Sequence, residues 1–85
     1  MKQENWNKEN KGKPWTDNEL KVVLSDAPTK NNCIKYAKAF KRGYGGVAQI
    51  YQWAATKKKE IKRKRPDDKF VNQIKNISKK LDWVV

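Results

Sequence analysis

Apolar residues along the chain recur at the three- and four-residue spacing that is typical of amphipathic helices. Four stripes of this kind follow one another. Their members are Leu20, Val23 and Leu24; Ile34, Ala37 and Phe40; Val47, Ile50, Tyr51 and Ala54; and Phe70, Ile74, Ile77 and Leu81. This pattern predicts an all-α fold.

Local signals predict where the first two helices begin and end. Thr16 with Glu19 three residues later forms a capping-box sequence at the start of the first helix. The residue before Pro28 is driven out of the α region, so this helix is expected to end by that point. Thr29 is expected to cap the second helix.

The third helix is expected to be long and partly outside the core. Gly43 suits the position just after the second helix, and Tyr44-Gly45-Gly46 suits a turn. No helix-breaking residue follows until Pro66, so a continuous helix would span about 20 residues, or about 30 Å. Its later half is almost entirely Lys and Arg and is predicted to project beyond the core.

Residues 66–85 are predicted to form a fourth, amphipathic helix, opened by Pro66-Asp67-Asp68. Packing of its stripe on the three-helix core is the favoured interpretation, and a homodimer surface is the alternative. Residues 14–65 are assigned to one domain, formed by the first three helices with a basic extension. Residues 1–13 are predicted to be a disordered arm, in which Trp6 either tucks onto the domain or remains exposed for stacking.

The charge of the chain indicates what kind of partner it binds. Its 85 residues include 21 Lys and Arg but 9 Asp and Glu, for a net charge of +12. Half of that net charge lies in residues 57–65, KKKEIKRKR. Such a density attracts polyanions, and the expected partner is nucleic acid. The last four of these residues with Pro66 also fit a nuclear localisation signal, although phosphate binding is the favoured interpretation.

Several functional classes are predicted to be absent. With one cysteine, Cys33, and no histidine, the sequence offers neither an internal disulfide nor an ordinary zinc site. Cys33 is expected to be a small buried apolar residue. We expect no metal, no cofactor, no small-molecule substrate and no enzymatic activity, because the one acidic pair, Asp67-Asp68, is explained by a helix N-terminus.

The expected location follows from the same composition. No apolar run approaches the roughly 20 residues that span a bilayer, and the N-terminus lacks the apolar region of a signal peptide. We therefore expect a cytoplasmic protein, nucleoid-associated in a bacterium or phage and nuclear in a eukaryote. The abundance of Lys and Asn favours a bacterial or phage source.

Residues 14–60 resemble a known family of DNA-binding domains. The matching features are Trp15-Thr16-x-x-Glu19-Leu20, Ala37-x-x-Phe40, Arg42 with Val47 five residues later, Trp53, and the run Gln49-Ile50-Tyr51-Gln52-Trp53 followed by Lys57-Lys58-Lys59. In order and spacing they resemble the Myb/SANT-like, homeodomain-like helix-turn-helix domains. The resemblance implies a three-helix fold whose third helix enters the major groove. Thr56 stands where the homeodomain has the asparagine that pairs with adenine.

The predicted site divides into base-reading and phosphate-binding residues. On the helix face opposite Val47, Gln can pair with adenine and Lys with guanine. The base-reading candidates are Gln49, Gln52, Thr56 and Lys59 from this face, with Ala55 added by the resemblance, which also puts Gln49 and Lys58 near phosphate. Both arguments name Gln52, Thr56 and Lys59. The predicted phosphate contacts are Arg42, Lys57, Lys58, Lys62, Arg63, Lys64 and Arg65.

The sequence therefore predicts that residues 14–65 form a helix-turn-helix DNA-binding domain with a basic extension. The protein is expected to act as a transcriptional regulator that binds duplex DNA, with no membrane partner. An RNA-binding protein is one alternative, in which Trp6, Tyr44 and Tyr51 would stack on unpaired bases. A small adaptor or inhibitor that binds an acidic protein surface is the other. An ordinary solvated face is the plain interpretation of the polar residues on the third helix, and core packing is the favoured one for Trp53.

Overall fold

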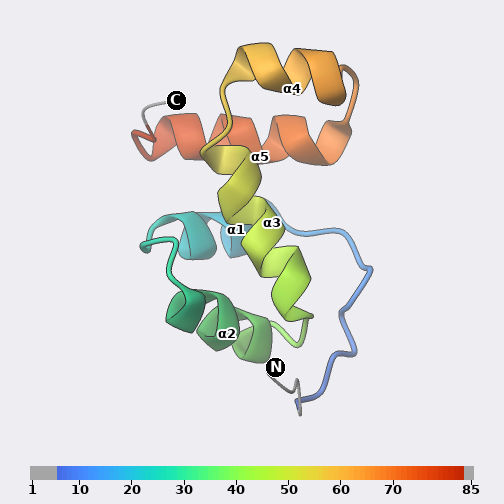
Figure 1. Cartoon of the computed structure of the whole chain (residues 1–85). Coiled ribbons are helices and arrows are strands. Elements are labelled where there is room, and N and C mark those ends of the chain that lie inside the picture. Colours follow the sequence, from blue (N-terminus) through green and yellow to red (C-terminus); the bar gives the residue numbers. More distant parts are fainter. Residues whose placement is uncertain (1–5, 84–85) are drawn as a thin grey trace.

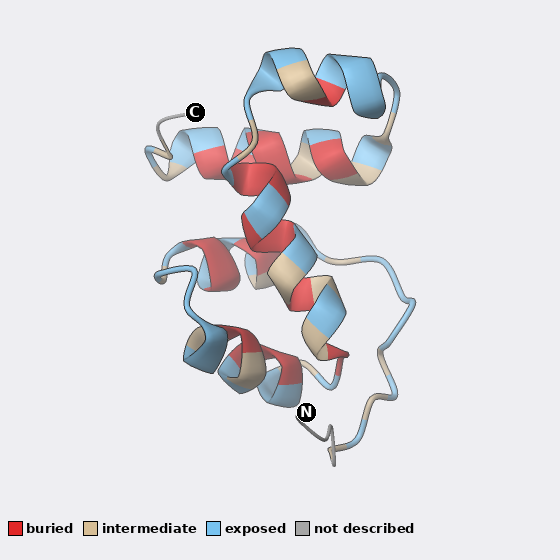
Figure 2. Ribbon diagram, in the orientation of Figure 1, coloured by how far each residue is buried: buried red, intermediate tan, exposed pale blue. Residues whose placement is uncertain are grey.

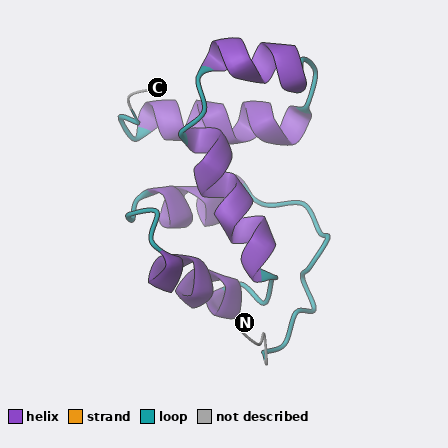
Figure 3. Cartoon of the chain, viewed as in Figure 1, coloured by secondary structure: helices purple, strands orange, loops and turns teal. Residues whose placement is uncertain are grey.

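Helix α3 (Tyr44–Ala54) crosses the middle of the molecule, and the other helices are arranged along it (Figure 1). The computed structural model describes residues 6–83, which contain α-helices and no strand (Figure 3). The helices are α1 (Asp17–Leu24), α2 (Lys30–Ala39), α3 (Tyr44–Ala54), α4 (Lys58–Lys64) and α5 (Lys69–Lys80). The predicted all-α class is confirmed.

Helix α3 is the element on which α1, α2 and α5 pack, and α1 also packs on α5. Helices α1 and α2 lie toward the N-terminal end of α3, whereas α4 and α5 form a helical hairpin at its C-terminal end (Figure 1). The core follows this arrangement, because the buried residues face inward toward α3 (Figure 2). Its apolar members are Leu20, Val23, Leu24, Cys33, Tyr36, Ala37, Val47, Ile50, Tyr51, Trp53, Ala54, Ile61, Val71, Ile74 and Ile77.

The predicted starts of the first two helices are confirmed. Thr16 and Glu19 form a complete capping box, in which each side chain accepts from the other residue's backbone N–H. The Thr29 side chain accepts from the backbone N–H of Asn32. Both bonds satisfy N–H groups that a helix leaves without an internal partner. Helix α1 ends at Leu24, before the expected limit.

The C-terminal end of α2 corrects the predicted role of Gly43. The left-handed residue is Lys41, with φ of 57°. The N–H of Lys41 donates to the carbonyl of Lys38 (3.3 Å), and the N–H of Arg42 donates to that of Ala37 (2.8 Å). These two bonds make a Schellman motif around Lys41. Gly43 instead is the N-cap of α3, with φ of −81°.

The predicted long third helix is wrong at both ends. Helix α3 begins at Tyr44, so Tyr44-Gly45-Gly46 is its first turn, and it ends at Ala54 instead of continuing to Pro66. Ala55, Thr56 and Lys57 separate it from α4. The basic segment therefore does not project from the core along the axis of α3 but folds back beside α5.

The interruption has a cause in the tertiary structure. The ammonium group of Lys75 on α5 donates to the carbonyls of Ala54 (3.1 Å) and Thr56 (2.9 Å), which a continuous helix would use for its own next turn. The Thr56 hydroxyl donates to the Gln52 carbonyl (2.6 Å). The change of direction then allows Ile61 of α4 to be buried.

The apolar stripe of α5 packs against the core of the same chain. It begins at Lys69, after Asp68, whose side chain accepts from the N–H of Val71 (3.0 Å). Val71, Ile74 and Ile77 are buried against the core. The core-packing interpretation is therefore the one observed, and the homodimer stays a prediction.

Part of the N-terminal arm, predicted to be disordered, contacts the domain. The Trp6 indole N–H donates to the Arg42 carbonyl (2.7 Å). Asn10 donates through its backbone to the Lys41 carbonyl and through its side chain to that of Phe40, both at 3.0 Å. Trp6 thus tucks onto the domain, while residues 1–5 of the predicted arm lie outside the described residues. No helix within residues 6–83 is long and apolar enough to cross a membrane.

Candidate nucleic-acid interface

Helix α4 and the residues that flank it carry the densest positive charge on the molecule. All seven basic side chains of residues 57–65 are exposed. Glu60 pairs with Arg63 (2.7 Å), and Arg65 lies 3.9 Å from Asp68. The remaining five make no ion pair within the described residues. They are Lys57, Lys58, Lys59, Lys62 and Lys64, which we call the unpaired lysines.

Helix α3 presents a different kind of surface. It contains no charged residue, and its buried side is formed by residues such as Val47 and Ile50. Gln49 and Gln52 are exposed on the opposite side, followed by Ala55 at the end of the helix. The exposed positions of α3 alternate with buried ones in Figure 2. This face has short, uncharged side chains that can form hydrogen bonds.

The two surfaces meet at residues 55–57, but they do not form one continuous helix face. Lys59, predicted to read bases from the same helix as Gln52, lies on α4. We therefore move Lys59 from the base-reading group to the phosphate-binding group. Thr56 is half-buried, and its hydroxyl hydrogen is engaged by the Gln52 carbonyl, so its oxygen can only accept a further hydrogen bond in this arrangement.

Arg42 was predicted to contact phosphate, but its side chain is not available for such a contact. Its residue is only 5% exposed. Its guanidinium donates to the carbonyls of Lys13 (2.6 Å) and Pro14 (3.0 Å), contacts Glu19 (3.3 Å), and lies 4.0 Å from the centre of the Trp15 ring. Arg42 therefore holds the 13–15 segment against α1, and this correction follows from its burial.

Lys75 is a buried cation that the sequence analysis missed. It is 8% exposed, and it lies between α5 and the end of α3. Burial lowers the pKa of its ammonium group below the usual value, and the charge of nearby Lys58 acts in the same direction. A signal was present in the sequence, because Lys75 lies on the same face of α5 as Val71 and Ser78, at four- and three-residue spacing.

The aromatic residues considered for base stacking are used mainly in packing. Tyr51 is buried, and its hydroxyl donates to the Val23 carbonyl (2.6 Å); burial also raises the pKa of this phenol. Tyr44 is half-buried against the core. Trp53 is 8% exposed, which confirms its predicted core role, and Cys33 is buried as expected.

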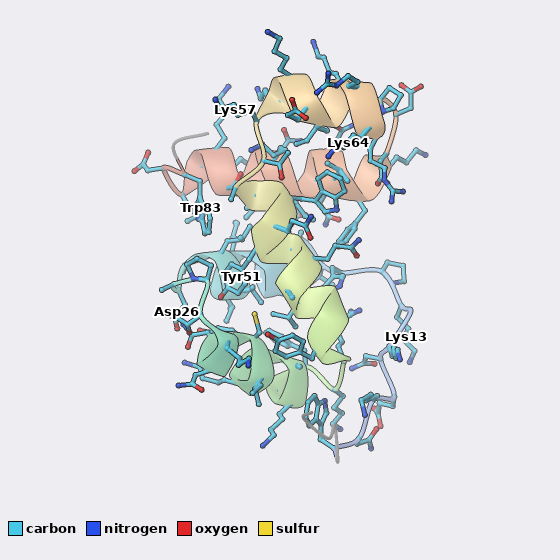
Figure 4. All side chains as sticks on the ribbon, in the orientation of Figure 1. Lys13, Asp26, Tyr51, Lys57, Lys64 and Trp83 are labelled. Carbon is cyan, nitrogen blue, oxygen red and sulfur yellow. The ribbon has the colours of Figure 1, made fainter. Side chains whose placement is uncertain are left out.

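Two hollows are lined in part by residues of α5. One lies between α4 and α5 and has a volume of about 370 Å³. The other, of about 630 Å³, lies between residues 12–15, Gln49 of α3 and the start of α5, where Phe70 and Gln73 line it. Figure 4 labels Lys57, the N-cap of α4, and Lys64, the last residue of that helix. Among the described residues, no group of three His, Cys, Asp or Glu side chains is placed to hold a metal ion.

These features define a small all-helical domain that carries a basic helical hairpin beside an uncharged helix face. The chain belongs to the family described as "Uncharacterised protein PM1205 C-terminal domain", whose sequence profile matches residues 9–85. That range includes all the helices from α1 to α5.

A curated relative shares much of this sequence. It is the "Uncharacterized protein PM1205" of Pasteurella multocida (strain Pm70), which is 47% identical over 73 residues. The match covers 86% of this chain and 58% of the relative, so the chain spans little more than half of that protein's length. No solved structure matches the chain. The resemblance to Myb/SANT-like domains stays a prediction.

Proposed function

We propose that this chain binds duplex DNA, with α2 and α3 acting as a helix-turn-helix and α4 binding phosphates. The observation that carries the proposal is the position of the unpaired lysines directly after the uncharged, exposed face of α3. In this scheme the protein is a regulator of transcription that recognises DNA through α3.

The electrostatic part of the proposal rests on uncompensated charge. Residues 57–65 have one acidic side chain, Glu60, which pairs with Arg63. The unpaired lysines would otherwise repel one another across a short helix, and a polyanion relieves that repulsion. Phosphate neutralisation releases counterions from DNA, which gives affinity without sequence preference.

The recognition part rests on the composition of α3. A helix fits the major groove, and the amide of Gln can pair with adenine there. Gln49, Gln52 and Ala55 are exposed and lie on a helix without charged residues, so nothing on this face favours phosphates over base edges. Thr56 completes the group as a hydrogen-bond acceptor.

In this proposal α3 and α4 have different roles. Lys57, Lys58 and Lys59 flank the C-terminal end of α3, where they would fix its position on the backbone without reading sequence. Lys62, Arg63, Lys64 and Arg65 extend the same contact along and beyond α4. Arg42 takes no part in either role.

The alternatives receive less support from the same contacts. RNA binding by base stacking needs exposed aromatic rings, whereas Tyr51 is buried and Trp6 is hydrogen-bonded to the backbone of Arg42. Binding to an acidic protein surface would use the same lysines, and it therefore becomes an outcome of the test.

The test compares nucleic acids by fluorescence anisotropy at about 150 mM salt, close to physiological ionic strength. We expect a randomised duplex pool to bind more tightly than single-stranded RNA. If about six phosphates are neutralised, log K should fall with log salt concentration with a slope near −5. Tighter binding to RNA, or no binding to either polymer, would contradict the proposal.

A further inference from the structure

The hollow between α4 and α5 is lined almost entirely by hydrogen-bond donors. Helix α4 contributes two lysines and one apolar residue, and α5 contributes one lysine and two asparagines. Figure 1 shows α4 lying alongside α5. The lining residues are Lys58, Ile61, Lys62, Asn72, Lys75 and Asn76.

No carboxylate lines this hollow. Glu60, the acidic residue of α4, contacts Arg63 and lines a separate hollow with Lys57 and Lys59. Asp68, at the start of α5, lies 3.9 Å from Arg65. The two exposed ammonium groups at this hollow, those of Lys58 and Lys62, therefore have no acid beside them in its lining.

The donors around the hollow are held at different depths. Lys75 is mostly buried at the base, where its ammonium group also contacts the carbonyls of Ala54 and Thr56. Lys58 and Lys62 are exposed at the rim, and no ion pair occupies either of them within residues 6–83. Burial, and after it the charge of nearby Lys58, lowers the pKa of Lys75 below its usual value.

We propose that the α4–α5 hollow binds a phosphate group of the nucleic-acid backbone, which makes α5 part of the interface. Lys58 and Lys62 supply charge, and the amide groups of Asn72 and Asn76 donate hydrogen bonds to phosphate oxygens. The inference rests on the proposed DNA binding. It adds α5 residues that no pattern in the sequence had suggested.

This site would also position the recognition helix. Lys75 connects the base of the hollow to the backbone at the end of α3 through Ala54 and Thr56. A phosphate bound there is held at a fixed place relative to the exposed face of α3. Such contacts set the register of a protein on DNA.

The first experiment uses charge changes with a matched control. Asn72→Asp and Asn76→Asp each add a negative charge to the hollow, and Asn18→Asp adds the same charge to an exposed position of α1, which has no part in the proposed interface. All three positions are exposed, so the variants are expected to fold. We expect the two changes in the hollow to weaken binding of a duplex oligonucleotide more than the control does.

A second pair of variants removes charge. Lys62→Gln takes one ammonium group from the hollow, and Lys21→Gln takes one from an exposed position of α1. We expect Lys62→Gln to reduce the steepness of the salt dependence by about 1, the contribution of one phosphate contact. Lys21→Gln should leave the slope close to that of the unchanged protein.

A third measurement does not depend on DNA. Inorganic phosphate is added at constant ionic strength while the side-chain amide signals of the asparagines are followed by NMR. We expect saturable shifts for Asn72 and Asn76 and none for Asn18, with the shifts lost in Lys62→Gln.

The outcomes separate the two proposals. Duplex binding with equal losses in Asn72→Asp, Asn76→Asp and Asn18→Asp, together with unmoved amide signals, overturns the phosphate site and leaves DNA binding intact. Failure to bind any duplex overturns the proposed function, and the assignment of the hollow to a nucleic-acid phosphate falls with it, whatever inorganic phosphate does.

Discussion

Arg42 shows how burial changes the meaning of a basic residue. Its guanidinium donates to the carbonyls of Lys13 and Pro14 and contacts Glu19. Arg42→Ala would leave these partners unsatisfied and remove a contact with the Trp15 ring. We expect the free energy of unfolding in urea to fall by about 3 kcal/mol, as for other broken buried pairs.

The conservative variant separates the structural role from a phosphate-binding role. Arg42→Lys retains the charge but cannot reproduce the forked hydrogen bonds, so we expect an intermediate loss of stability. Under conditions in which the Arg42→Lys variant is fully folded, it should bind duplex DNA as tightly as the unchanged protein. Weaker binding with normal stability would instead return Arg42 to the interface.

Asp26 gives the fold a dependence on acid. Its carboxylate accepts from the Tyr36 hydroxyl (2.7 Å), from the Ala27 N–H (3.0 Å) and from the Lys35 ammonium (3.3 Å). The Tyr36 hydrogen bond, followed by those from Ala27 and Lys35, lowers the pKa of Asp26 below its ordinary value of 3.8. The folded form therefore holds the charged carboxylate more strongly than the unfolded form does.

The lowered pKa of Asp26 makes the free energy of unfolding fall in acid. A lowered carboxyl pKa contributes stability that is present above the unfolded pKa and is lost as the pH falls through the folded one. The stability difference between the unchanged protein and Asp26→Asn should be constant above about pH 5 and shrink below about pH 4. Urea denaturation at a series of pH values measures it, and a difference that stays constant down to pH 2 would contradict the assignment.

At the scale of elements, the predictable features were those with local causes. Thr16 and Thr29 bond to backbone groups three residues ahead, and such caps can be read directly from a short stretch of sequence. The end of α3 could not be read in this way. It depends on Lys75, which binds the carbonyls of Ala54 and Thr56 from another helix.

Gly43 illustrates the same limit on a shorter scale. Glycine is the usual left-handed residue after a helix, but here Lys41 takes that conformation and Gly43 begins the next helix. The preference of glycine for the left-handed conformation therefore pointed to Gly43, two residues away from the residue that adopts it.

Ile61 is the residue that attaches α4 to the rest of the molecule. It is the buried residue of α4, whereas the basic positions around it are exposed. We expect Ile61→Ala to lower the free energy of unfolding by about 2 kcal/mol, at the low end for a buried Ile because a short surface helix can readjust. Hydrogen exchange should become faster at the amides of 58–64 and stay slow in the core of α3.

An exposed apolar residue provides the control for this prediction. Val22 is 47% exposed on α1, so Val22→Ala should change stability by less than about 0.5 kcal/mol. Equal effects of the two substitutions, or protection of α4 that survives Ile61→Ala, would show that α4 is not held by this contact.

At the scale of the whole molecule, the location of the charge was predictable and its arrangement was not. The excess of Lys and Arg in residues 57–65 is visible in the sequence. A straight helix would have aligned Lys59 with Gln52, whereas the turn at residues 55–57 places Lys59 on α4 and brings that helix against α5. The contribution of Asn72 and Asn76 depends on this tertiary arrangement, so no local pattern could indicate it.

The division between phosphate binding and base reading can be tested by two kinds of substitution. Replacing Lys57, Lys58 and Lys59 together by Ala should weaken binding to all duplexes about equally and reduce the steepness of the salt dependence by about 3. A variant with Lys11, Lys13 and Lys21 replaced by Ala has the same net charge and changes only exposed positions outside α2–α5. A smaller loss is expected for this control, because its lysines lie outside the proposed interface.

Gln52→Ala should behave differently, because a base contact distinguishes one sequence from another. Once a preferred site has been selected from a randomised duplex pool, we expect this variant to lose about 1–3 kcal/mol of its preference for that site over random DNA, with the salt slope unchanged. Gln52 is exposed and its side chain makes no hydrogen bond within residues 6–83, so stability should change little. Equal losses on the preferred site and on random DNA would remove Gln52 from the base-reading group and leave α3 as a helix that only positions α4.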